Sequence, residues 1–110
     1  LKRVSDDYTK IPLFITENGA AFDDSLPPDG SVVDDSARID YLSSHIDAAR
    51  RACECGVNLQ GYYVWSLMDN FEWAQGYSKR FGLVHVDLKT QRRTLKRSAL
   101  WYRDFIRSHQ

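Results

Sequence analysis

The fold is decided by the stretch Leu13-Phe14-Ile15-Thr16-Glu17-Asn18-Gly19. Its first half is almost continuously apolar, which is typical of a strand covered on both faces in a parallel sheet. The run then ends abruptly in a carboxylate, an amide and a glycine. A carboxylate in that position lies at the rim of a sheet, where a substrate can reach it. We therefore expect a strand over about residues 11–16 and a substrate-accessible carboxylate at Glu17.

A long helix is expected next, over about residues 35–54. Asp34 or Asp35 would cap its start, and Gly56 would close its end as the first residue beyond the cap. Apolar side chains recur there at steps of three and four and predict a buried stripe that consists of Leu42, Ile46, Ala49 and Cys53.

A second strand and a second helix complete the pattern. Aromatic and β-branched residues predict a strand over about residues 58–66, and a short strand, one arm of a hairpin, is expected within residues 81–87. Thr94 would cap a final helix over about residues 95–108. The order strand, helix, strand, helix predicts an α/β fold with parallel strands. Two parallel strands do not form a stable sheet alone, so the chain either dimerises or is part of a larger sheet.

Composition excludes several classes of protein. The 110 residues carry no formal net charge, which disfavours a nucleic-acid partner, and the basic run Arg92, Arg93, Lys96 and Arg97 is interpreted as a solvated helix start. No apolar run is long enough to span a membrane, and no secretory signal is visible. Cys53 and Cys55 are poorly placed to pair and lack partners for a metal site. We expect reduced thiols in a cytoplasmic protein without cofactor or metal.

Aromatic rings and carboxylates gather after the second strand. Such a loop suits a sugar, because rings stack on the C–H face of a pyranose and carboxylates accept hydrogen bonds from its hydroxyls. Taken singly, Trp65 or Trp73 would more commonly belong to a core. Asp69 is expected to order the loop through hydrogen bonds to the backbone. His45 is interpreted as a structural histidine on the long helix, and His85 is assigned no role.

Three motifs in this order resemble the C-terminal part of family 1 glycoside hydrolases, the β-glucosidase family. They are Ile15–Gly19 (ITENG), Trp65–Trp73 (WSLMDNFEW) and Arg80–Leu83 (RFGL), and the final Ser98–Tyr102 (SALWY) extends the resemblance over nearly the whole chain. The family fold is a (β/α)8 TIM barrel. The resemblance therefore implies that residues 1–110 are a C-terminal fragment of one barrel domain, its last two βα units, incomplete on its own.

The resemblance also assigns roles to individual side chains. Glu17 would be the catalytic nucleophile of a retaining mechanism, which forms a glycosyl-enzyme ester that water then hydrolyses. Glu72 would bind the 4- and 6-hydroxyls of the sugar and Trp73 the 3-hydroxyl. Trp65 would lie beneath the sugar, and Phe81 would form a wall near its 6-hydroxyl. The family also tends to have a cis peptide bond after the residue that matches Trp65.

One part of the family pattern is absent. The acid/base glutamate of a Thr-Asn-Glu-Pro-like motif does not occur in these residues, and retaining hydrolysis needs two carboxyl groups about 5–5.5 Å apart. The resemblance thus implies a retaining β-glucosidase whose acid/base residue lies outside this chain, and an isolated chain that is inactive. The implied partners are a β-glucoside or oligosaccharide and the N-terminal part of the barrel. Relatives that act on 6-phosphosugars avoid a carboxylate at the position of Glu72, which favours a plain glycoside.

Two alternatives stay open. A non-catalytic sugar-binding module could use Trp65, Glu72 and Trp73 without chemistry, but it would not need Glu17 at a strand end. A barrel-complementing fragment would contribute mainly packing.

Overall fold

The structure, a computed structural model, describes residues 1–8 and 10–109. Its elements, in chain order, are the helix α1 (Lys2–Asp7), the strand β1 (Leu13–Asn18), the helix α2 (Ser36–Glu54), the strand β2 (Leu59–Val64), the 3-10 turn η1 (Trp73–Gln75), the strands β3 (Val84–Val86) and β4 (Arg93–Leu95), and the helix α3 (Arg97–Ser108).

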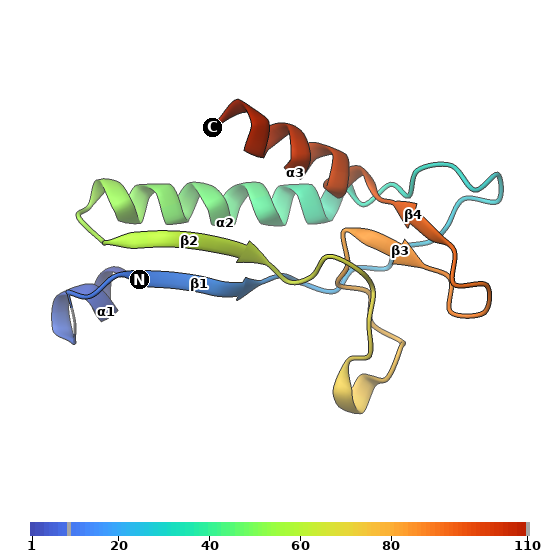
Figure 1. The fold of residues 1–110 in the computed structure, drawn as a ribbon, viewed down its shortest axis with the longest axis horizontal. Coiled ribbons are helices and arrows are strands. Elements are labelled where there is room, and N and C mark those ends of the chain that lie inside the picture. Colours follow the sequence, from blue (N-terminus) through green and yellow to red (C-terminus); the bar gives the residue numbers. More distant parts are fainter. Residues whose placement is uncertain (9, 110) are drawn as a thin grey trace.

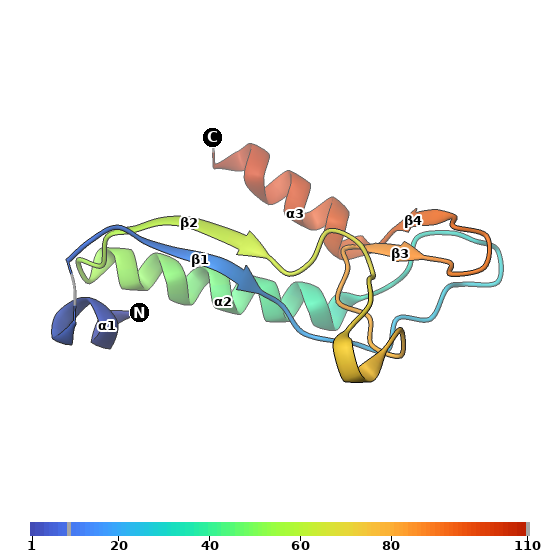
Figure 2. The ribbon, with the colours of Figure 1, turned by 60° about the horizontal axis from the view of Figure 1, so that its bottom comes forward.

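A two-stranded parallel sheet and two helices form the main body. β1 pairs with β2, with Leu13 opposite Leu59 and Ile15 opposite Tyr62. α2 runs back along the strands, and α3 lies beside α2 (Figure 1). β3 and β4 form an antiparallel hairpin beyond the carboxyl ends of β1 and β2, next to the loops that follow those strands (Figure 2). The predicted α/β arrangement with parallel strands is therefore observed.

The first strand lies two residues later than predicted, at 13–18 instead of 11–16. Pro12 has no N–H to donate, so the ladder starts with the Leu13 N–H, which donates to the Asn58 carbonyl at 2.8 Å. It continues to Asn18, whose carbonyl accepts from the Trp65 N–H at 2.9 Å. The second strand is shorter than the predicted 58–66.

The long helix begins one residue later than predicted and ends where expected. Gly56 follows it at φ +84°, a conformation that a residue with a side chain rarely adopts. Leu42 and Ala49 are buried as expected, but the predicted buried position of Cys53 is wrong. Cys53 lines an open hollow between α2, β2 and α3, and Cys53 and Cys55 both carry exposed free thiols.

The start of the final helix differs from the prediction of about residue 95. Thr94 lies in β4, opposite His85, and does not cap the helix, which begins at Arg97. The free N–H of Ser98 in its first turn instead donates to a carboxylate oxygen of Asp35 at 2.8 Å. Asp35 is itself the residue before α2, and its side chain makes no cap hydrogen bond to that helix, unlike the prediction. Its carboxylate instead accepts from Arg38 in the first turn of α2 and so ties the starts of both helices together.

The chain is more extended than a globular protein of its length. Its radius of gyration is 16.0 Å, against about 13 Å for a compact domain of this size. Its accessible surface of 7339 Å² exceeds the roughly 6200 Å² of a folded monomer of this mass. On the sheet, Phe14 and Tyr63 are 54% and 58% exposed.

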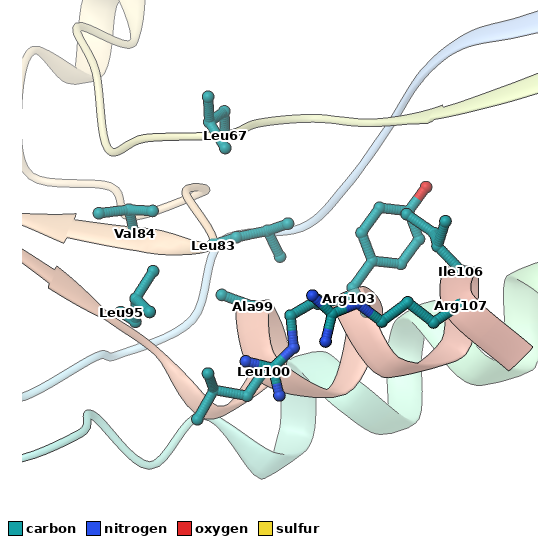
Figure 3. A pocket seen from close by; sticks show the side chains of 10 residues that line it. Leu67, Leu83, Val84, Leu95, Ala99, Leu100, Arg103, Ile106 and Arg107 are labelled. Atoms are coloured by element: carbon teal, nitrogen blue, oxygen red, sulfur yellow. The ribbon is translucent and has the colours of Figure 1, made fainter.

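An apolar groove of about 510 Å³ lies between α3 and the β3–β4 hairpin (Figure 3). Its lining consists of Leu67, Leu83, Val84, Leu95, Ala99, Leu100, Tyr102, Arg103, Ile106 and Arg107. None of the side chains predicted to bind sugar lines it, so the groove is not the candidate sugar site.

We expect the isolated chain to associate instead of unfolding as a cooperative monomer, because its sheet edges and apolar groove are open. Sedimentation velocity from about 1 to 100 µM and calorimetry at the lowest of these concentrations would test this. A dilute monomer with one sharp thermal transition would contradict it.

Candidate active site

Glu17 is the penultimate residue of β1, and its side chain is exposed. A glutamate at a strand end would ordinarily be expected to join a surface ion pair. Among the described residues, however, Glu17 makes no ion pair and no side-chain hydrogen bond. The carboxylate therefore stands free at the end of the sheet where the loops gather.

The carboxyl ends of β1 and β2 meet closely just after Glu17. The Trp65 N–H donates to the Asn18 carbonyl. Gly19 packs against the Trp65 carbonyl so closely that an added Cβ would lie 1.7 Å from its oxygen. Only glycine fits at position 19 for this reason. The peptide bond between Trp65 and Ser66 is cis, as predicted.

Backbone hydrogen bonds also place Phe81 beside the end of β2. The Ser66 N–H donates to the Phe81 carbonyl at 3.2 Å, and the Leu83 N–H donates to the Ser66 carbonyl at 2.9 Å. Trp65 and Phe81 are both half-buried. The structure thus brings the backbone of Trp65 and Phe81 next to the end of the strand that carries Glu17.

Glu72 and Trp73 occupy a separate loop that projects away from the sheet around η1 (Figure 1). The Glu72 N–H donates to the Gly76 carbonyl at 2.7 Å, and Trp73 has a φ of 43° with its side chain 82% exposed. Within residues 1–8 and 10–109, no hydrogen bond or ring contact joins these two side chains to Glu17. The backbone hydrogen bonds of this loop order its own turn, but they leave Trp73 exposed and Glu72 half-buried.

A buried cluster of three cations and three carboxylates lies beneath these loops. Its members are Asp24, Asp35, Arg38, Asp69, Arg80 and Lys96. The Lys96 ammonium is fully buried and donates to Asp24 at 2.6 Å and to Asp69 at 2.9 Å. The predicted solvated position of Lys96 is therefore wrong: the charge is buried because two carboxylates from distant loops surround it.

Arg38 forms the second centre of this cluster. Its guanidinium donates to Asp35 at 2.6 Å, to Asp24 at 2.7 Å and to the Arg80 carbonyl at 2.7 Å, and it lies over the Phe22 ring at 5.1 Å. Asp24 therefore accepts from both buried cations. Because Asp24 lies in the loop after β1 and Asp69 in the loop after β2, the cluster holds the two loops of the candidate site in one arrangement.

Asp69 orders its loop through the backbone, as expected. Its carboxylate accepts from the N–H groups of Gly82 at 3.0 Å and Val86 at 3.3 Å, and from the Arg80 guanidinium at 3.0 Å. Burial alone would raise the pKa of Asp69, but the hydrogen bond and the charge of Lys96, with Arg80, outweigh it and lower that pKa. Asp69 is therefore ionised and does not act as a proton donor at neutral pH.

The two histidines of interest differ. His45 is exposed, stacks on Tyr41 with ring centroids 3.9 Å apart, and its Nδ1 lies 2.7 Å from the Tyr41 carbonyl oxygen. His85 is buried in β3, and its Nδ1 has no partner among the described residues. Burial, and then the charge of Arg80, lower the pKa of His85, so that it is neutral at pH 7.

No metal site or membrane span is found in the described part of the chain. Groups of three or more His, Cys, Asp or Glu side chains that could hold a metal ion do not occur among these residues. None of their helices combines the length and apolar character needed to cross a membrane.

Comparisons with known proteins agree with the motifs. The model of the family described as Glycosyl hydrolase family 1 matches residues 1–110. Beta-glucosidase A of Thermotoga maritima is 54% identical over 109 residues, which cover 99% of this chain and 24% of that protein. A 6-phospho-beta-galactosidase of Staphylococcus haemolyticus is 43% identical over 111 residues, 100% of this chain and 24% of that protein. The chain thus spans about a quarter of the length of the relatives it matches.

A solved family 1 β-glucosidase from Thermotoga maritima matches the fold directly. It superposes with a TM-score of 0.92 and 55% identity over 96% of this chain and 24% of its own. The same enzyme has been solved with isofagomine lactam and with deoxynojirimycin.

A hybrid enzyme, in which residues 1–110 replace the matching segment of the Thermotoga maritima β-glucosidase, allows the buried cluster to be tested. We expect Lys96→Ala to lower the free energy of unfolding by about 3–5 kcal/mol, because two buried carboxylates lose their cation. Arg97→Ala, which removes an exposed pair with Asp34, is the control and should cost less than about 1 kcal/mol. Urea unfolding would measure both, and equal losses would contradict a special role for the buried charge.

The match of the family model to residues 1–110 and the superposition on a solved family 1 β-glucosidase thus agree with the three sequence motifs and with the arrangement of their loops. This chain belongs to glycosyl hydrolase family 1.

Proposed function

We propose that residues 1–110 form the last two βα units of a (β/α)8 barrel and carry the nucleophile of a retaining β-glucosidase. The observation that carries the proposal is the free carboxylate of Glu17 at the end of β1, next to the close junction of Gly19 and Trp65. The rest of the barrel would supply the acid/base residue. That residue must lie on the other side of the scissile bond, with its carboxyl group about 5–5.5 Å from that of Glu17.

The proposed mechanism has two steps. Glu17 attacks the anomeric carbon while the acid/base residue protonates the departing oxygen, which yields a glycosyl-enzyme ester. Water, deprotonated by the same acid/base residue, then releases the sugar and frees Glu17. Trp65 would support the sugar from below, Phe81 would bound it near the 6-hydroxyl, and Glu72 and Trp73 would bind hydroxyls after the rest of the barrel closes around their loop.

The surfaces left open support this assignment. The apolar groove along α3 (Figure 3) and the exposed sheet side chains Phe14 and Tyr63 are where neighbouring barrel elements would pack.

The cytoplasmic location and the absence of a nucleic-acid, membrane or cofactor partner also stay predictions.

The alternative of a sugar-binding module or of a barrel-complementing fragment is less well supported. Neither role requires an unpaired carboxylate at residue 17, and a packing element would not need the exposed indole of Trp73.

In the hybrid enzyme, we expect an activated 2-deoxy-2-fluoro β-glucoside to esterify Glu17, which peptide mass spectrometry would locate. Glu17→Gln should abolish the labelling and lower kcat by roughly 10⁶-fold, as loss of a nucleophile does in acyl transfer. Glu54→Gln, at the exposed end of α2, is the control and should behave as the unmodified hybrid. Label on another carboxylate would contradict the proposal, and turnover by the isolated chain would contradict its predicted inactivity.

Glu72 should decide between plain and 6-phosphorylated sugars, since its carboxylate would repel a phosphate. We expect Glu72→Gln to lower kcat/KM for a plain β-glucoside by roughly 10–100-fold through loss of a charged hydrogen bond. The relative rate with a 6-phospho-β-glucoside should rise. Glu72→Asp keeps the charge and should not gain the phosphorylated substrate; an equal gain in both variants would contradict this role.

A further inference from the structure

Asn18, the residue after Glu17, has both polar ends of its side chain held. The Tyr62 hydroxyl donates to Asn18 Oδ1 at 2.6 Å, and Asn18 Nδ2 donates to the Tyr41 hydroxyl at 3.3 Å. The Tyr41 hydroxyl donates in turn to the Gly19 carbonyl at 3.3 Å. The three hydrogen bonds therefore point in the same direction, from β2 to β1, from β1 to α2, and from α2 to the loop after β1. In such a series each hydrogen bond polarises the next.

The backbone around Asn18 is fixed as well. Its carbonyl accepts from the Trp65 N–H, and Gly19 has no free space against the Trp65 carbonyl. Asn18 is thus held through its side chain and its main chain. Because Glu17 is bonded directly to it, the position of the Glu17 backbone depends on these contacts.

An irregularity in β1 explains how the neighbouring residues Glu17 and Asn18 come to face different sides of the sheet. Ile15 and Asn18 both line a groove with Ala48 of α2, although a separation of three would place them on opposite faces of a regular strand. The pairing register shifts between these two residues, as at a β-bulge, and leaves Thr16 and Glu17 exposed. Asn18 is thus directed to the helix layer, and Glu17 to the uncovered side.

We propose that Tyr62, acting through Asn18, is a positioning residue for Glu17, with Tyr41 completing the chain of hydrogen bonds. The inference rests on the proposed function. Attack on an anomeric carbon requires the carboxylate oxygen within a narrow distance and angle, so a strand end that shifts by a fraction of an ångström slows the covalent step. Tyr62 does not touch the sugar in this proposal. Its loss therefore changes the rate of bond formation and not the binding of the substrate.

The Tyr62 hydroxyl, which is the first donor in this series of hydrogen bonds, stays protonated over any working pH. Burial, with smaller contributions from Tyr41 and Tyr102, raises the pKa of Tyr62 to about 12. The donor to Asn18 is thus constant between pH 5 and pH 9.

The test compares Tyr62→Phe with Tyr63→Phe in the hybrid enzyme. Both variants remove one hydroxyl from neighbouring positions of β2, but only that of Tyr62 donates to Asn18 among the described contacts. We expect Tyr62→Phe to lower kcat and the maximal rate constant of Glu17 labelling by the fluoro glucoside roughly threefold to tenfold, the value of one hydrogen bond, with KM nearly unchanged. Tyr63→Phe should leave both rate constants unchanged.

Asn18→Ala gives a second, independent measurement. If Tyr62 acts through Asn18, the double variant should be no slower than Asn18→Ala alone, because both changes break the same chain. Labelling of Glu17 at the unmodified rate in Tyr62→Phe, or a lower melting temperature without a change in rate, would overturn the inference while leaving the proposed function intact. An unmodified hybrid that is never labelled at Glu17 would contradict the proposed function and overturn this inference with it.

Discussion

Two buried cations, Lys96 and Arg38, share the carboxylate of Asp24, and the organisation of the loops depends on that shared contact. Burying an unpaired charge is very costly, so each ion is retained only while its partners stay in place. The partners come from the loop after β1, the loop after β2 and the starts of both long helices. Together with the buried side chains of Val33, Leu83 and Val86, the ionic cluster therefore forms the core of the loop region.

The candidate site residues are held in place by two different parts of the structure. Glu17 is carried by the sheet itself, at the point where the two strands meet without space for a side chain at position 19. Glu72 and Trp73 are carried by a loop that Asp69 and Lys96 hold only at its base. Under the proposed function, this arrangement would suit a reaction in which the nucleophile must be placed narrowly while the sugar hydroxyls are bound by closure of the surroundings.

The open surfaces and the missing acid/base residue have one explanation in the proposed barrel. A sheet of two parallel strands leaves both edges and one face uncovered, and closing it into a barrel covers these surfaces and brings further strand ends to the same rim. Under the proposed function, the segment would carry the nucleophile but only part of the active site. The reaction would become possible only when a second carboxyl group is placed opposite Glu17.

Local periodicity and short spacings in the sequence predict the parallel βα pattern, the strand that leads to Glu17, the helix end closed by Gly56, and the family motifs. The sequence also indicated the loop-ordering role of Asp69. Contacts between distant segments explain why Lys96 is buried, why Asp35 serves the start of α3 in place of Thr94, and why two tyrosines hold Asn18. These contacts join residues as far as 72 positions apart, such as Asp24 and Lys96, and no local pattern records which distant charges meet.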